Sequence, residues 1–106
     1  MERADLRDIL RLFRQGLENI YQDRLVQVIL YGSQARGDAR PDSDVDVLVV
    51  LRGTETAADR ERVLDLVTDL NLEHGVLVSR VCISEDLFRT RQGPFLRNVR
   101  REGVAV

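Results

Sequence analysis

The chain has 106 residues, of which 43% are hydrophobic and 32% charged. This composition is typical of a globular domain and excludes a disordered or fibrous chain, so we expect residues 1–106 to form a single domain. The formal net charge of -2 gives no overall basic field, so nucleic acid is not an expected partner. A single cysteine, a charged N-terminus and the lack of a long apolar run predict a cytoplasmic protein without a membrane partner.

The first third of the chain predicts a helix, a strand and a second, very short helix. Residues 3–21 carry apolar side chains at helical spacing, namely Leu6, Ile9, Leu10, Phe13, Leu17 and Ile20. Residues 25–31 are rich in Val, Ile, Leu and Tyr and predict a strand that ends at Gly32. A short helix from Ser33 to about Arg36 follows, and Pro41 places a turn over residues 40–43.

The middle of the chain predicts a second strand and a long helix. Residues 44–51 form the strand, and Thr54 is the expected N-cap of a helix over about 55–73 that ends before Gly75. The apolar face of this helix comprises Val63, Leu64, Val67 and Leu70, with Leu66 as a further candidate.

The last third predicts a strand over residues 76–83, with Cys82 in the core, and then two helices. Ser84 begins one helix, and the other follows Pro94 and turns Phe95, Leu96 and Val99 inward. The alternation of strands and helices predicts an α/β (α+β) domain, with a small mixed sheet of three or more strands packed with helices.

Two carboxylates lie one residue apart at the start of the second strand. Asp44 and Asp46 point to the same face, because side chains alternate along a strand. Neighbouring carboxylates repel and favour a bound cation, most simply Mg²⁺. The alternative is a pair of solvent-facing acids, although Asp is depleted in strands.

A glycine–serine turn precedes these acids by about ten residues. Gly32 allows a ligand close to the backbone, and Ser33 offers a hydroxyl and an N–H at a helix start, as a phosphate requires. Ser33 as a plain N-cap is the alternative interpretation. Together the two features predict binding of a nucleoside triphosphate with its metal ion.

The segment GSQARGDARPDSDVDVLVV, residues 32–50, resembles the signature of the minimal nucleotidyltransferases of the DNA polymerase β superfamily. The resemblance implies a nucleotidyltransferase-like fold and a transferase that uses ATP as substrate. It implies that Asp44 and Asp46 are catalytic and hold Mg²⁺, and that Gly32 and Ser33 bind the triphosphate. Arg36 and Ser43 would also contact phosphate. The alternatives are that Arg36 pairs with Asp38 or Asp42, and that Ser43 is a turn serine.

One expected acid is missing. Active members of the family carry a third carboxylate on the next strand, where this chain has no Asp or Glu and Ser79 takes the position. Glu73 lies upstream at a helix end, where a solvated acid is the simpler interpretation. The sequence therefore supports nucleotide and metal binding more strongly than turnover.

The family resemblance also implies a partner. Minimal nucleotidyltransferases pair with a small helical HEPN toxin and act as its antitoxin, by transferring AMP to it or by binding it. Both functions stay open here, together with a third, a nucleotide-binding subunit of a larger transferase. The C-terminal arginines, Arg89, Arg91, Arg97, Arg100 and Arg101, form either a solvated helix face or a docking surface for an acidic partner or RNA. Edge strands in so small a sheet would also allow a homodimer.

Overall fold

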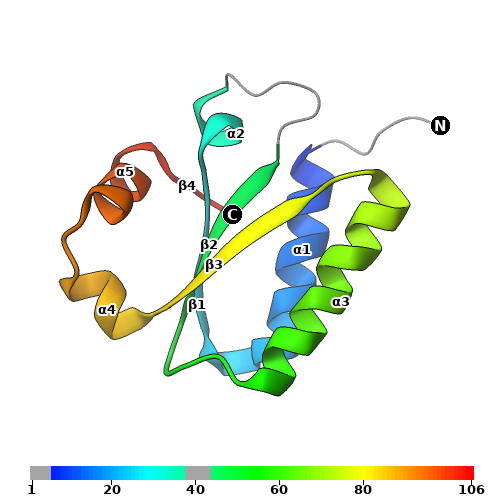
Figure 1. Ribbon diagram of the computed structural model, residues 1–106, viewed down its shortest axis with the longest axis horizontal. Helices are drawn as coiled ribbons and strands as arrows, with labels where there is room; N and C mark the ends of the chain where they lie inside the picture. Colours follow the sequence, from blue (N-terminus) through cyan, green and yellow to red (C-terminus); the bar gives the residue numbers. More distant parts are fainter. Residues whose placement is uncertain (1–5, 38–43) are drawn as a thin grey trace.

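The computed structural model describes residues 6–37 and 44–106 as a four-stranded sheet flanked by helices (Figure 1). The elements in chain order are α1 (Leu6–Tyr21), the 3-10 turn η1 (Gln22–Arg24), β1 (Leu25–Tyr31), α2 (Ser33–Arg36), β2 (Val45–Leu51), α3 (Ala57–His74), β3 (Val78–Ser84), α4 (Glu85–Thr90), α5 (Pro94–Glu102) and β4 (Val104–Ala105). In this part of the chain, no helix combines the length and the hydropathy of a membrane span.

The sheet is mixed and has the strand order β3-β2-β1-β4. β1 pairs with β2 in antiparallel fashion and places Tyr31 opposite Asp46, whereas β2 and β3 are parallel and place Asp46 opposite Ser79. The predicted fold class is thus confirmed. The short strand β4, which pairs with Ile29 and Leu30 near the end of β1, was not predicted.

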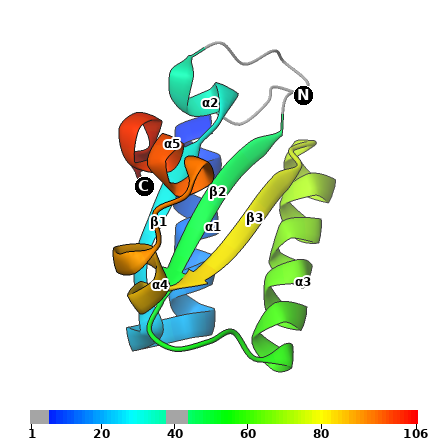
Figure 2. The same ribbon diagram turned by 60° about the vertical axis from the view of Figure 1, so that its left-hand side comes forward.

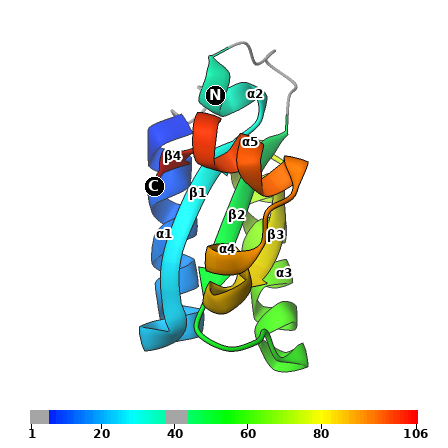
Figure 3. The same ribbon diagram turned by 90° about the vertical axis from the view of Figure 1, so that its left-hand side faces the viewer.

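Helices cover both faces of the sheet, as Figures 2 and 3 show, with α1 and α3 on one face and α4 and α5 on the other. Alternate residues of β2 serve the two cores. Val45, Val47 and Val49 pack toward α1 and α3, while Leu48 and Val50 pack with α5. A central strand buried on both faces requires a continuous apolar run, which explains the sequence from Val47 to Leu51.

The start of α3 differs from the predicted one. Thr56, and not Thr54, is the N-cap, and it forms a capping box with Asp59 through two hydrogen bonds of 3.0 Å. Asp59 is buried and also accepts two hydrogen bonds from the Arg24 guanidinium, at 2.8 and 3.0 Å. The acid three residues after Thr56 fixes the cap there, because it satisfies the N–H of Thr56 as well.

Two residues predicted to lie in the core do not. Leu64 is 62% exposed, because the face that α3 turns to the sheet is narrow and passes through Val63 and Leu70. Phe95 is 42% exposed, and its ring lies edge-on against the ring of Tyr31, with the centroids 5.3 Å apart. Leu96 and Val99 are buried as predicted, so two of the three apolar residues expected on the inward face of α5 lie in the core.

Candidate functional site

The two acids of the motif lie at the N-terminal end of β2. Asp44 is exposed and directly precedes the strand, and Asp46 is half-buried within it. Burial raises the pKa of the Asp46 carboxyl, and the charge of Asp44 raises it further. The structure therefore brings the two carboxylates into one electrostatic site, where the charge of Asp44 disfavours the ionised form of Asp46.

The backbone of Gly32 lies directly against this site. Gly32 has φ 76° and ψ −155°, a conformation that is essentially restricted to glycine. A methyl group at its Cα would lie 2.7 Å from Oδ2 of Asp46. The glycine thus joins the two halves of the motif, because only a residue without a side chain permits this approach.

Ser33 begins α2, at the same end of the sheet (Figure 1). The carbonyl of Gly32 accepts the N–H groups of Ala35 and Arg36, both at 3.1 Å. The N–H of Ser33 belongs to the first turn, where a helix provides no acceptor of its own. Gly32 is the N-cap, so the alternative interpretation of Ser33 as a capping serine is wrong.

Arg36 connects α2 with α5. Its guanidinium lies 3.4 Å from a carboxylate oxygen of Glu102, and both side chains are partly or largely exposed. The alternative partners that the sequence offered, Asp38 and Asp42, lie outside the described residues, as does Ser43. An exposed ion pair of this kind contributes little to stability, so it leaves Arg36 able to exchange Glu102 for a phosphate.

Ser79 lies beside Asp46 in the parallel ladder and is exposed, so the structure places it where the sequence put the missing acid. Glu73 is at the end of α3, exposed and 3.8 Å from His74. In residues 6–37 and 44–106, no group of three or more His, Cys, Asp or Glu side chains surrounds one point.

The donor set suits Mg²⁺ in part. Asp44 and Asp46 supply two of the hard oxygen ligands that this ion prefers, and their mutual repulsion would be relieved by it. Mg²⁺ commonly takes its remaining ligands from water and substrate phosphates. The turn at Gly32 and Ser33 lies where such phosphates would bind.

A second polar cluster, which was not predicted, lies beyond the other end of β2. Glu55 accepts hydrogen bonds from Tyr21 at 2.5 Å, from Arg80 at 2.7 Å and from Cys82 at 3.1 Å. Burial and the hydrogen bond to Glu55 raise the pKa of the Cys82 thiol to about 11, so it is a poor nucleophile. Arg80 within an apolar strand was the available signal, because a half-buried arginine needs an acidic partner.

The fold and this site define a domain that places a phosphate-binding type of turn against a pair of carboxylates. The model of the nucleotidyltransferase domain family matches residues 10–97 of the chain. A relative from Methanocaldococcus jannaschii, described as a "Putative protein adenylyltransferase", is 39% identical over 92 residues, which cover 86% of this chain and 87% of the relative.

Two solved structures share the fold. One, described as a "putative minimal nucleotidyltransferase", has a TM-score of 0.66 and 29% identity and covers all of both chains. The other, a tri-AMPylated HEPN toxin from Shewanella oneidensis in complex with an MNT antitoxin, has a TM-score of 0.54 and 19% identity, with 93% of this chain and 66% of that chain covered. This chain belongs to the nucleotidyltransferase domain family.

Proposed function

We propose that this protein transfers AMP from ATP to a hydroxyl group of a partner protein, with Mg²⁺ and with release of pyrophosphate. The observation that carries this proposal is the contact of the Gly32 backbone with the Asp46 carboxylate. A turn suited to phosphate and a site suited to a metal ion thereby become one site. The matching family and the adenylyltransferase description of the relative support the same chemistry.

Each motif residue has a role in this proposal. Asp44 and Asp46 would hold Mg²⁺, which supplies charge neutralisation and Lewis acidity at the phosphates. The backbone of Gly32 and the N–H and hydroxyl of Ser33 would bind the terminal phosphates. Arg36, now beside Glu102, would turn to the triphosphate, since a guanidinium suits bidentate phosphate contact. Ser43, which lies outside the described residues, would also contact phosphate.

The proposed partner is a small helical toxin of the HEPN type, and the protein would act in the cytoplasm as its antitoxin. Support comes from the neighbour of known structure, in which a toxin of this type is AMPylated and bound to an MNT antitoxin. A likeness at 19% identity establishes the fold alone, so the partner rests on this proposal and on the test below.

Docking without turnover is the second candidate function, and Ser79 is the observation that favours it. A hydroxyl beside Asp46 is a weak metal ligand and does not accept a proton at neutral pH. In this case the protein would bind nucleotide and partner but silence the partner stoichiometrically.

Mass spectrometry of a HEPN-type protein encoded beside this chain's gene, after incubation with ATP and Mg²⁺, separates the two functions. Transfer predicts an added AMP mass that Asp46→Asn reduces at least about 100-fold, since each 1.4 kcal/mol of lost stabilisation is a factor of ten. Asp65→Asn, an exposed acid of α3, is the matched control and should leave the rate unchanged.

An unmodified partner that still forms a stable complex would refute transfer and support docking. Ser79→Asp would then test the cause, because restoring a carboxylate beside Asp46 should restore AMP transfer. A modified partner whose yield is insensitive to Asp46→Asn would refute the assigned site.

A further inference from the structure

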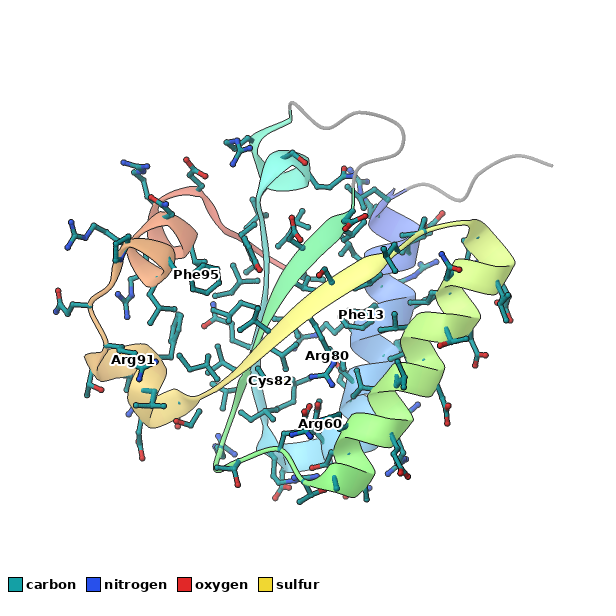
Figure 4. The ribbon with its side chains drawn as sticks, in the orientation of Figure 1. Phe13, Arg60, Arg80, Cys82, Arg91 and Phe95 are labelled. Atoms are coloured by element: carbon teal, nitrogen blue, oxygen red, sulfur yellow. The ribbon has the colours of Figure 1, made fainter. Side chains whose placement is uncertain are left out.

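A groove of about 820 Å³ runs along β3 from Arg80 to Ser84 and begins one residue beyond the Asp46–Ser79 pair. Its walls come from both sides of the strand, as Figure 4 shows. Val81, Leu87, Arg91 and Phe95 line the side of α4 and α5, and Arg60 and Arg80 line the side of α3. The groove therefore passes over the outer edge of β3.

This edge carries backbone groups that the sheet does not use. β3 ends the strand order, and among the described residues no strand pairs with its outer side. The carbonyl of Leu77 accepts the N–H of Val45 at 2.9 Å, so the backbone of Leu77 points toward β2. Because direction alternates along a strand, the N–H and C=O groups of Arg80 and Cys82 point outward.

The two walls of the groove differ in chemistry. On the α4 and α5 side, Val81, Leu87 and Phe95 are 42%, 44% and 42% exposed, which leaves an apolar surface with Arg91 at its rim. A strand added at this edge would place alternate side chains against this surface and against the opposite wall.

The opposite wall is basic. Arg60 has a side chain that is 68% exposed, and Arg80 lies deeper beside Glu55. Glu55 is nearly buried, and its carboxylate binds Arg80, Tyr21 and Cys82 and also lies 3.3 Å from Nε of Arg60. Hydrogen bonds and the charge of Arg80 lower the pKa of Glu55 although burial alone would raise it, so this acid stays ionised with one charge against two arginines. An acidic side chain of a ligand is therefore the complementary group for Arg60.

We propose that the outer edge of β3 binds an extended segment of the acceptor protein as an additional strand. Apolar side chains of the segment would pack on Val81, Leu87 and Phe95, and the intervening acidic side chains, on the opposite face, would pair with Arg60. This inference rests on the proposed transferase function for its occupant. Val81 lies about 7 Å along the strand from Ser79, so a segment seated there would lead its next residues to Asp46. Edge pairing is a known route to peptide recognition.

The test uses the isotope-labelled full chain and a nine-residue peptide in which valine and aspartate alternate. Nuclear magnetic resonance should show the amide signals of Arg80 and Cys82 shifting and their hydrogen exchange slowing as peptide is added. The same peptide with N-methyl groups on alternate residues cannot donate to the edge and should lose these effects. A peptide with lysine in place of aspartate should bind at least roughly fivefold more weakly, because its charges oppose the basic wall.

Charge-reversal variants of α3 test whether Arg60 is the arginine that attracts the acidic peptide. Arg60→Glu should weaken binding of the valine–aspartate peptide at least roughly fivefold. Arg62→Glu changes an exposed arginine of the same helix that does not line the groove, and it should not. Equal binding by the N-methylated peptide, or no response of the Arg80 and Cys82 amides, would overturn the proposal. Slowed exchange at these amides that rises with protein concentration without peptide would also overturn it, because the occupant would then be a second copy of the chain.

A non-hydrolysable ATP analogue with Mg²⁺, added to the same sample, keeps the two proposals separate. It should shift the amides of Gly32, Ser33 and Asp46. If the nucleotide acts there while the peptide does not act on β3, the groove proposal fails and the transferase site stands. If only the peptide acts, the nucleotide site is the part that fails.

Discussion

Acidic residues lie near both ends of β2, and their surroundings differ in kind. At the start of the strand, Asp44 and Asp46 have no basic partner among the described residues, and burial and the charge of Asp44 raise the pKa of Asp46. After the strand, Asp59 holds Arg24 and the α3 cap, and hydrogen bonds from Arg24 and Thr56 lower its pKa. One carboxylate is thus kept at a cost to the fold, while the other stabilises it.

This difference separates a site from a scaffold. A half-buried acid whose charge is opposed destabilises the fold until a cation arrives, and such groups mark functional sites. Asp59, by contrast, is buried and uses both carboxylate oxygens, in the capping box with Thr56 and in the ion pair with Arg24. These contacts orient α3, and they leave the carboxylate unavailable to a ligand. Three substitutions test whether the comparison holds.

The largest effect is expected for Gly32→Ala. The new methyl group would lie 2.7 Å from Asp46 Oδ2 in a backbone conformation that other residues avoid, which should lower the free energy of unfolding by about 3 kcal/mol. Urea titration measures this loss, and nucleotide binding should disappear in the variant that remains folded.

Gly75→Ala provides the control for backbone strain. Gly75 is left-handed at the end of α3, with nothing within 4 Å of its missing Cβ, so the expected loss is only about 1 kcal/mol. Equal losses at Gly32 and Gly75 would show that the contact with Asp46 adds nothing.

The next effect is expected for Asp59→Ala, at about 2 kcal/mol of lost stability, the upper range for removal of a helix cap. Because the folded-state pKa of Asp59 is lowered, its contribution is present above the ordinary aspartate pKa of about 4 and is lost as pH falls below it. Thermal unfolding of both proteins should therefore differ at pH 7 and converge toward pH 2. Asp65→Ala, an exposed acid on the same helix, should change stability by less than about 0.5 kcal/mol.

The smallest expected effect on stability is a gain rather than a loss. Asp46→Asn removes one of two like charges and should raise the free energy of unfolding at pH 7 by roughly 0.5 kcal/mol without metal. The folded-state pKa of Asp46 is raised, so this gain should vanish below about pH 4. At such pH values the Asp46 carboxyl of the parent protein is protonated in both the folded and the unfolded state. A variant that is less stable than the parent at pH 7 in chelator would contradict the repulsion.

Local patterns predicted most of the elements and the residues at the motif. The strand over 25–31 and the short helix over 33–36 lie where predicted, because a β-branched run and a Gly–Ser turn are short-range signals. The cap of α3 was misplaced by two residues, because Thr56, and not Thr54, lies three residues before an acid, Asp59, that completes the capping box and also pairs with Arg24. The exposure of Leu64 and Phe95 likewise depends on which face the neighbouring elements occupy.

The family and the motif follow from the sequence alone, because a glycine, a serine and two alternate aspartates act through local geometry. The family resemblance put the missing acid at Ser79, and the parallel pairing of β2 and β3 places this serine beside Asp46. Only the tertiary structure brought Gly32 against Asp46, joined Glu55 to Arg80 and opened a groove at the edge of β3. These contacts link residues far apart in the chain, and their formation depends on strand order and helix packing rather than on neighbours in sequence.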